Sequence, residues 1–140
     1  MPIEKSAGAV IFRKEEDKVY YLLLHYQAGH WDFSKGNIEK GEKIEETIER
    51  EIQEETGITD IEFISGFRQT IKYFYKLKGK TIFKTVVFYL IQTKTKEVKI
   101  SWEHTDFKWL TYEKALGQIT FQNAKEILKK ANDFLSEKGL

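Results

Sequence analysis

The stretch of sequence that decides the fold is residues 36–58, which read GNIEKGEKIEETIEREIQEETGI. Its central part, residues 42–56, consists mostly of good helix formers and is followed by Gly57, a residue type that commonly ends helices. At about 100° per residue, three isoleucines fall within an arc of about 80° on such a helix: Ile44, Ile48 and Ile52. The stretch therefore predicts an amphipathic helix whose isoleucine face packs on a hydrophobic core.

Three glutamates of this helix, Glu51, Glu54 and Glu55, lie beside or inside the isoleucine stripe on the helical wheel. A half-buried carboxylate needs a compensating charge, and three together repel one another, which raises their pKa values unless a cation lies among them. Hard oxygen ligands at this spacing suit Mg²⁺ or Mn²⁺. The alternatives are that Arg50 satisfies some of the charge, or that this is a surface helix with an unusually acidic rim.

Charge is unevenly distributed along the chain, whose net charge is +1. Residues 36–58 contain eight glutamates against three basic residues, so this stretch carries −5 and the remainder carries +6. An acidic island in basic surroundings suits a metal site that receives a polyanion. Charge counts alone, however, favour a solvated acidic helix on a lysine-rich surface.

Composition narrows the class of protein. The 140 residues are 41% hydrophobic, enough for a core, and include no cysteine, which excludes disulfides, thiolate metal sites and a cysteine nucleophile. No apolar run approaches the roughly 18 residues needed to span a bilayer, and the first residues lack the layout of a signal peptide. We therefore expect one domain over residues 1–140, in a soluble, cytoplasmic protein with no membrane partner.

Apolar and alternating patterns elsewhere predict a series of strands. The expected strands are residues 6–13, 19–26, 61–77, 81–93 and 103–110. The third is expected to break near Gly66, and residues 28–41 are expected to form a loop. Thr111 and Thr120 are the expected N-caps of a short helix and of a final helix that ends near Leu135. This order predicts an α+β fold in which helices cover a mixed sheet.

The spacing within residues 36–58 resembles the complete signature of the Nudix hydrolase family. That signature is G-x5-E-x7-R-E-U-x-E-E-x-G-U, where U is aliphatic, and Gly36, Glu42 and residues 50–58 fill every fixed position. The resemblance implies an α/β/α sandwich and a hydrolase that cuts a nucleoside diphosphate linked to another group. It also implies dependence on a divalent metal, which would activate a water and neutralise charge on the phosphates.

The resemblance implies particular roles for the acidic residues. The metal ligands would be Glu51, Glu54, Glu55 and the carbonyl oxygen of Gly36. Arg50 would be a supporting residue that orients carboxylates. The general base differs among family members, so it could be a glutamate of the signature, such as Glu54 or Glu55, or one outside it. Glu103, beside the ionisable His104, is the best outside candidate for base or metal ligand, and the alternative is a surface glutamate at a strand end.

Segments outside the signature resemble the diadenosine tetraphosphate hydrolases of animal and archaeal type, a subgroup of this family. These segments are HWDFSKG (30–36), GFR (66–68), KTVVFYL (84–90) and EH with WL (103–110). The resemblance implies asymmetric hydrolysis of diadenosine tetraphosphate to ATP and AMP. Two residues depart from the subgroup: Ser34 replaces a proline, so the loop is expected to be less stiff, and Asn37 replaces a frequent histidine.

The subgroup also implies which residues bind the substrate. Tyr73 would stack on adenine, which is worth roughly 1–3 kcal/mol per base, although Tyr75 lies on the same strand face and alternation does not separate the two. Phe134 would close the other side of the ring, the alternative being ordinary aromatic packing. The remaining candidates are Lys84 and Lys35, which would meet phosphates as flexible point charges, and His30.

Two other readings stay open. The first is a Nudix pyrophosphohydrolase that acts on a nucleoside triphosphate or on a triphosphorylated RNA 5′ end. The second is a non-catalytic nucleotide-binding module, which predicts a broken signature. We therefore expect a small nucleotide as the partner. The lack of a concentrated basic stripe with interleaved aromatic residues argues against nucleic acid, and the sequence predicts no oligomeric state.

Overall fold

The structure is a computed structural model that describes residues 2–140. Its strands are β1 (Ile3–Glu15), β2 (Lys18–Tyr26), β3 (Trp31–Asp32), β4 (Ser34–Asn37), β5 (Glu62–Leu77), β6 (Lys80–Gln92) and β7 (His104–Leu110). Its helices are α1 (Ile44–Thr56), α2 (Tyr112–Gln118) and α3 (Gln122–Glu137). Each strand and helix expected from the sequence is present, with ends that differ by a few residues.

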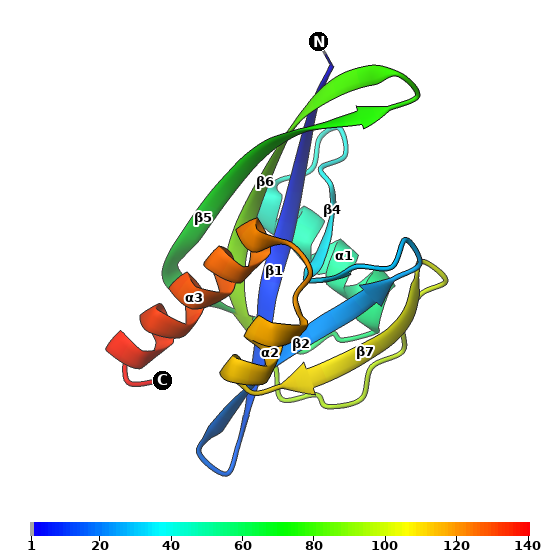
Figure 1. Ribbon diagram of the computed structural model, residues 1–140. Coiled ribbons are helices and arrows are strands. Elements are labelled where there is room, and N and C mark those ends of the chain that lie inside the picture. The colour runs from blue at the N-terminus through cyan, green and yellow to red at the C-terminus, as the bar shows by residue number, and fades with distance from the viewer. Residues whose placement is uncertain (1) are drawn as a thin grey trace.

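The seven strands form one sheet, in which β3, β2, β1, β6 and β5 lie side by side in that order. β4 pairs with β1, and β7 pairs with β2. β1 and β6 run parallel, with Ala7 beside Val87, whereas the other pairs are antiparallel. The predicted mixed sheet of an α+β fold is therefore confirmed (Figure 1).

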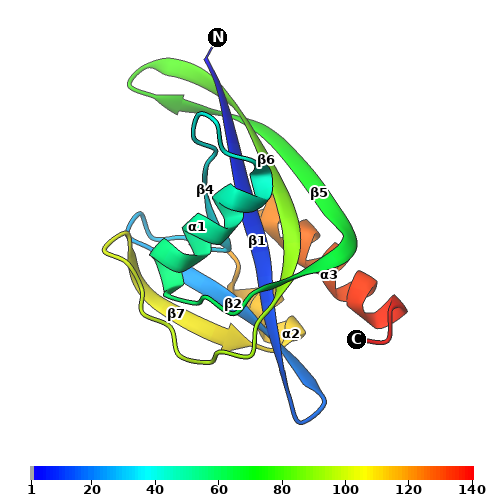
Figure 2. The ribbon, with the colours of Figure 1, turned by 180° about the vertical axis from the view of Figure 1, so that it is seen from behind.

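Helices cover both faces of the sheet because successive residues of its central strand point in opposite directions. Ala7 and Ile11 of β1 belong to a core shared with Ile48 of α1. Val10 and Phe12 belong to a second core, which includes residues of α2 and α3. Figures 1 and 2 show α1 on one side of the sheet and the two later helices on the other. This is the predicted α/β/α sandwich.

Helix α1 is fixed to the sheet by its isoleucine stripe, as predicted. Ile48 and Ile52 are each 1% exposed, and Ile44 is half-buried against the same core. The helix ends at Gly57, which has a φ of 76° and donates its N–H to the carbonyl oxygen of Gln53 (2.9 Å). The C-terminal end of α1 is therefore determined locally, and the orientation of the helix on the sheet is determined by the core.

Strands β5 and β6 form a long hairpin that projects past α1 (Figure 2). Their pairing shifts between Phe63 and Arg68, where Gly66 has a φ of 97°, so the expected break is found. Beyond it, alternate residues face opposite sides of the hairpin: Tyr73 is half-buried, whereas Phe74 is 61% exposed. One face of the hairpin is therefore available to a site within the protein and the other is open to solvent.

Two local expectations are wrong. Residues 28–41 are not wholly a loop, because they contain β3 and β4, and β4 lies so close to β1 that a Cβ on Gly8 would approach Lys35 to 2.9 Å. Thr120 does not cap the last helix, which begins at Gln122; its hydroxyl instead accepts the N–H of Trp31 (2.8 Å). No helix among residues 2–140 is long and apolar enough to cross a membrane.

Candidate active site

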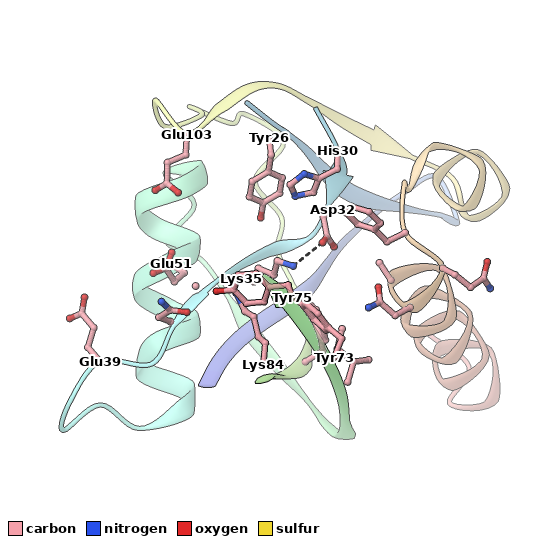
Figure 3. Close-up of a pocket in the computed structure, with 18 residues that line it drawn as sticks. Tyr26, His30, Asp32, Lys35, Glu39, Glu51, Tyr73, Tyr75, Lys84 and Glu103 are labelled. Atoms are coloured by element: carbon pink, nitrogen blue, oxygen red, sulfur yellow. Dashed lines mark hydrogen bonds and ion pairs between the residues drawn. The ribbon is translucent and has the colours of Figure 1, made fainter. Parts of the chain in front are cut away.

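A cavity of about 970 Å³ lies where β4, α1, the β5–β6 hairpin and the start of α3 meet. Figure 3 shows Glu39, Glu51 and Glu103 along the side nearest α1, while Tyr73, Tyr75 and Lys84 of the hairpin lie further from that helix. The cavity therefore has an acidic end and an aromatic, basic wall.

The acidic end depends on close contact between β4 and α1. A Cβ placed on Gly36 would lie 2.1 Å from Cδ of Glu51, so only glycine leaves room for this carboxylate. Burial raises the pKa of Glu51, and the carboxylates of Glu54 and Glu103 raise it further, whereas the Arg50 hydrogen bond lowers it. Glu51 therefore sits where a nearby positive charge stabilises its ionised form.

The contact with Gly36 gives a test. Gly36→Ala is expected to displace Glu51 and to lower hydrolytic activity by about 10²-fold, the scale seen when groups that support a metal site are lost. Steady-state kinetics would check this. Gly117→Ala is the matched control, because nothing lies within 4 Å of the added methyl and the backbone there has no positive φ. Equal activity of the two variants would contradict the assigned role of Gly36.

Arg50 gathers the carboxylates on this side of α1. Its guanidinium donates to Glu42 (2.7 Å), to Glu51 (2.6 Å) and to Glu54 (3.3 Å), and also to the carbonyl oxygen of Asn37 (3.1 Å). The hydrogen bond from Arg50 lowers the pKa of Glu42 to about 2. The supporting role predicted for Arg50 fits these contacts.

Glu54 and Glu55 differ in their surroundings, although both were expected beside the isoleucine stripe. The side chain of Glu54 is 59% exposed and contacts Arg50. Glu55 is 2% exposed, and its Oε1 accepts hydrogen bonds from the hydroxyl of Ser34 (2.5 Å) and the N–H of Lys35 (3.1 Å). Burial, reinforced by other nearby carboxylates, raises the pKa of Glu55 to about 8. The half-buried environment predicted from the helical wheel is therefore found for Glu55 but not for Glu54, which lies at the edge of the stripe and turns to solvent. The metal-binding roles of both residues stay predictions.

Glu103 enters the cavity from the turn before β7. The turn is anchored by the N–H of Gln27, which donates to the carbonyl oxygen of Glu103 (3.0 Å). The next residue, His104, is buried, with Nε2 3.6 Å from Oε2 of Glu55. Glu103 is therefore brought to the acidic end, as the sequence predicts, and His104 adjoins the buried glutamate.

The predicted phosphate-binding lysines both line the cavity. Lys35, which is half-buried, makes an ion pair with Asp32 (3.0 Å, Figure 3). Burial alone would lower the pKa of Lys35, but Asp32 and Tyr73 together outweigh this and raise it. Lys84 contacts Glu4 (3.7 Å), and burial together with the charge of Lys35 lowers its pKa. The cavity therefore holds two positive charges about its aromatic wall.

The aromatic residues at the cavity are only partly those predicted. Tyr73, Tyr75 and His30 line it. Phe134 does not: it packs against Phe67 (ring centroids 5.7 Å apart) and beneath Gly66, which favours the alternative of ordinary aromatic packing. The ring at that end of the cavity is Phe121, which lies 5.3 Å from the His30 ring.

Sequence reasoning also missed Tyr26 and Asp32, which line the cavity. The ring of Tyr26 stacks on His30 at 4.6 Å, and its hydroxyl donates to the carbonyl oxygen of Phe33 (2.6 Å). Tyr26 ends an apolar strand and so reads as a core residue in the sequence. Asp32 stands beside Trp31 in a segment recognised for its lysine and glycine, and no residue spacing marks it.

Comparison with known proteins identifies the family. The family model for the NUDIX domain matches residues 2–131. The chain belongs to the Nudix family. It is 33% identical to the asymmetrical bis(5′-nucleosyl)-tetraphosphatase of Mus musculus, over 94% of this chain and 95% of that protein. The crystal structure of a Caenorhabditis elegans Ap4A hydrolase binary complex superimposes with a TM-score of 0.84 at 32% identity, covering 96% of this chain and 98% of that one.

Other relatives are named for a different activity. An RNA pyrophosphohydrolase of Nitratiruptor is 30% identical, over 78% of this chain and 76% of that protein. The chain is therefore a Nudix hydrolase homologous to the asymmetrical tetraphosphatases, as the sequence predicts. Nudix hydrolases generally use divalent metal ions.

The acidic end of this Nudix hydrolase suits such an ion. Its donors are carboxylate and carbonyl oxygens, the ligands that hard divalent cations prefer. Burial and mutual repulsion raise the pKa values of Glu51 and Glu55, so a cation among them would stabilise both ionised groups. Among residues 2–140 no three acidic or histidine side chains already converge as a metal site, because Arg50 draws Glu51 and Glu54 to itself. These oxygen ligands are therefore of the kind that a divalent cation requires. In this structure the guanidinium of Arg50 supplies the positive charge beside Glu51 and Glu54.

Proposed function

We propose that this protein hydrolyses diadenosine tetraphosphate asymmetrically to ATP and AMP, with Mg²⁺ as its metal. The observation that carries the proposal is that one cavity of about 970 Å³ joins a carboxylate cluster to a wall of tyrosines and lysines. A nucleoside needs the aromatic surface, and a polyphosphate needs both the lysines and a cation. The similarity to the asymmetrical tetraphosphatases, with 94–96% of the chain aligned, supports this substrate.

The metal ion would be held by Glu51, Glu54, Glu55 and the carbonyl oxygen of Gly36, with Glu103 beside it. When bound, it supplies neutralisation of phosphate charge and a water of lowered pKa. Nudix members use different general bases, so the resemblance does not identify the base. A general base must be exposed to the cavity and free to accept a proton. Glu103 lines the cavity and is exposed, whereas Oε1 of Glu55 is already engaged by two donors. We therefore assign proton acceptance from the attacking water to Glu103.

The lysines would position the phosphate chain. Lys35 pairs with Asp32, and Lys84 lies near Glu4. A carboxylate therefore balances the positive charge of each lysine before the substrate binds. A tetraphosphate would compete for both, and its higher negative charge favours the exchange. The ion pairs with Asp32 and Glu4 keep the two ammonium groups at the cavity wall and leave the cavity open for the substrate. Asp32 thereby orients Lys35 toward the hairpin wall.

The tyrosine wall gives the second test. Tyr73→Ala is expected to raise the KM for diadenosine tetraphosphate by about 10- to 100-fold, since a stacked base is worth roughly 1–3 kcal/mol. Phe74→Ala is the matched control, because Phe74 is the next residue but faces solvent on the other side of the hairpin. Equal KM values for the two variants would contradict adenine binding at this wall. Tyr75→Ala, measured alongside, separates the two tyrosines.

The substrate is tested by comparing kcat/KM for dinucleoside polyphosphates, nucleoside triphosphates and ADP-ribose, each with Mg²⁺. We expect diadenosine tetraphosphate to have the highest value. Higher values for nucleoside triphosphates or for RNA bearing a 5′-triphosphate would instead support pyrophosphohydrolase activity, which the similarity to an RNA pyrophosphohydrolase keeps as the second candidate.

A further inference from the structure

The imidazole of His104 is buried at a point where nothing in the reaction proposed above uses it. The residue is 4% exposed, and Nε2 has no hydrogen-bond partner among residues 2–140. Buried polar atoms without a partner are rare in folded proteins. Oε2 of Glu55 lies 3.6 Å from Nε2, slightly beyond hydrogen-bond reach. A small movement of this carboxylate would complete the bond.

The contacts of Ser101 indicate which nitrogen carries the proton. Its hydroxyl lies 3.0 Å from Nδ1 of His104 and accepts the N–H of Glu103 (3.3 Å). When Glu55 is ionised, as a metal ligand must be, Nε2 has to donate. Nδ1 then accepts, and the Ser101 hydroxyl proton is directed to it. Once Oε2 of Glu55 closes the 3.6 Å gap to Nε2, one hydrogen-bonded chain would connect the backbone of Glu103 to the carboxylate of Glu55.

The other oxygen of Glu55 is held from the opposite side. Oε1 accepts the Ser34 hydroxyl and the Lys35 N–H, as described above. Ser34 is 3% exposed and stands where the resembling hydrolases have proline, which has no side-chain donor. The departure that the sequence shows at this position therefore adds a hydrogen bond to the buried glutamate.

We propose that Ser34 and His104, with Ser101 behind the imidazole, are positioning residues that fix the two oxygens of Glu55 for metal binding. The inference rests on the proposed function only in that Glu55 holds the metal. Groups that orient a metal ligand in this way commonly change metal affinity by about 10- to 100-fold when they are lost. Ser34, at the start of β4, restrains Oε1 of Glu55 directly through its hydroxyl.

The test measures Mn²⁺ binding by titration calorimetry without nucleotide, so that it does not depend on the substrate. His104→Gln places an amide N–H near the position of Nε2, whereas His104→Asn reaches only the position of Nδ1. We expect His104→Asn to bind Mn²⁺ about 10- to 100-fold more weakly than wild type and His104→Gln to recover most of that loss. Ser34→Ala and Ser101→Ala are expected to weaken binding about 10-fold.

His25→Asn is the control, since His25 contacts Thr105 and Trp31 and does not line the cavity. It should bind Mn²⁺ as wild type does. Wild-type affinity of His104→Asn, or equal losses in His104→Asn and His104→Gln, would overturn the proposal. If His104→Asn does not fold, wild-type affinity of both serine variants would overturn it equally. If the variants lose Mn²⁺ affinity as expected but the wild-type protein does not cleave diadenosine tetraphosphate, the proposed substrate is disproved and this inference stands.

Discussion

Glu55→Gln is expected to lower hydrolysis of diadenosine tetraphosphate by about 10³-fold and, at the same time, to make the metal-free protein more stable at pH 8. The loss of activity follows because the amide neither binds a hard cation as a carboxylate does nor carries negative charge. The gain of stability follows from burial, which raises the pKa of Glu55 from 4.5 to about 8. Opposite effects on activity and stability are the mark of a residue kept for function.

The sign of the stability effect follows from the pKa values. A carboxyl group whose pKa is raised in the folded state favours folding while it is protonated, and this contribution is lost as pH rises from about 4.5 to about 8. Glutamine has no such loss, so the variant should gain about 4 kcal/mol in unfolding free energy at pH 8 relative to wild type and little at pH 4. Chemical denaturation at the two pH values, with chelator present, measures this.

Magnesium should reverse the order of stability. A cation that binds only the folded state raises stability, so Mg²⁺ should stabilise the wild type and have little effect on Glu55→Gln. Glu49→Gln, an exposed position on the same helix, is the control and should leave activity, stability and the Mg²⁺ effect unchanged. Wild-type activity of Glu55→Gln, or a metal-free variant that is less stable at pH 8, would show that Glu55 is a structural residue.

Arg50→Met is expected to cost about 3 kcal/mol in unfolding free energy and about 10²-fold in activity. The side chain is 24% exposed and contacts Glu42, Glu51 and Glu54, so its removal leaves three carboxylates facing one another. Arg50→Lys should restore little of either property, because an ammonium group cannot make the two-sided contacts of a guanidinium. Urea denaturation and steady-state kinetics check both effects.

The comparison for Arg50 is Arg68→Met, which removes an exposed guanidinium that contacts Tyr89 away from the cavity. It should change stability by less than about 0.5 kcal/mol and leave kcat unchanged. Because Mg²⁺ replaces part of the lost positive charge, it should stabilise Arg50→Met more than it stabilises wild type. A variant Arg50→Met as stable and active as wild type would contradict the organising role of this arginine.

The sequence predicts the helix of the active site well because the same pattern determines both its fold and its chemistry. Ile44, Ile48 and Ile52 define the buried face, and the position of Glu55 on that face correctly predicts a buried carboxylate. Glu54 is different: it lies at the margin of the face, where a helical wheel does not distinguish a half-buried side chain from one that turns outward to Arg50.

The cavity wall is harder to predict because it is assembled from distant segments. Phe134 and Phe121 both belong to the C-terminal region, and only the register of α3 on the sheet places one at the cavity and the other against Phe67. Ser34 reads in the sequence as the loss of a stiffening proline. Its hydrogen bond to Glu55 depends on how β4 lies against α1, which no local pattern encodes.

The most direct test of the proposed reaction is to separate the products formed from diadenosine tetraphosphate in the presence of Mg²⁺. The account predicts ATP and AMP in equal amounts, formed from one water per substrate, and no reaction when the metal is chelated. Formation of ADP alone, turnover that persists without a divalent metal, or no cleavage while nucleoside triphosphates release pyrophosphate would contradict it.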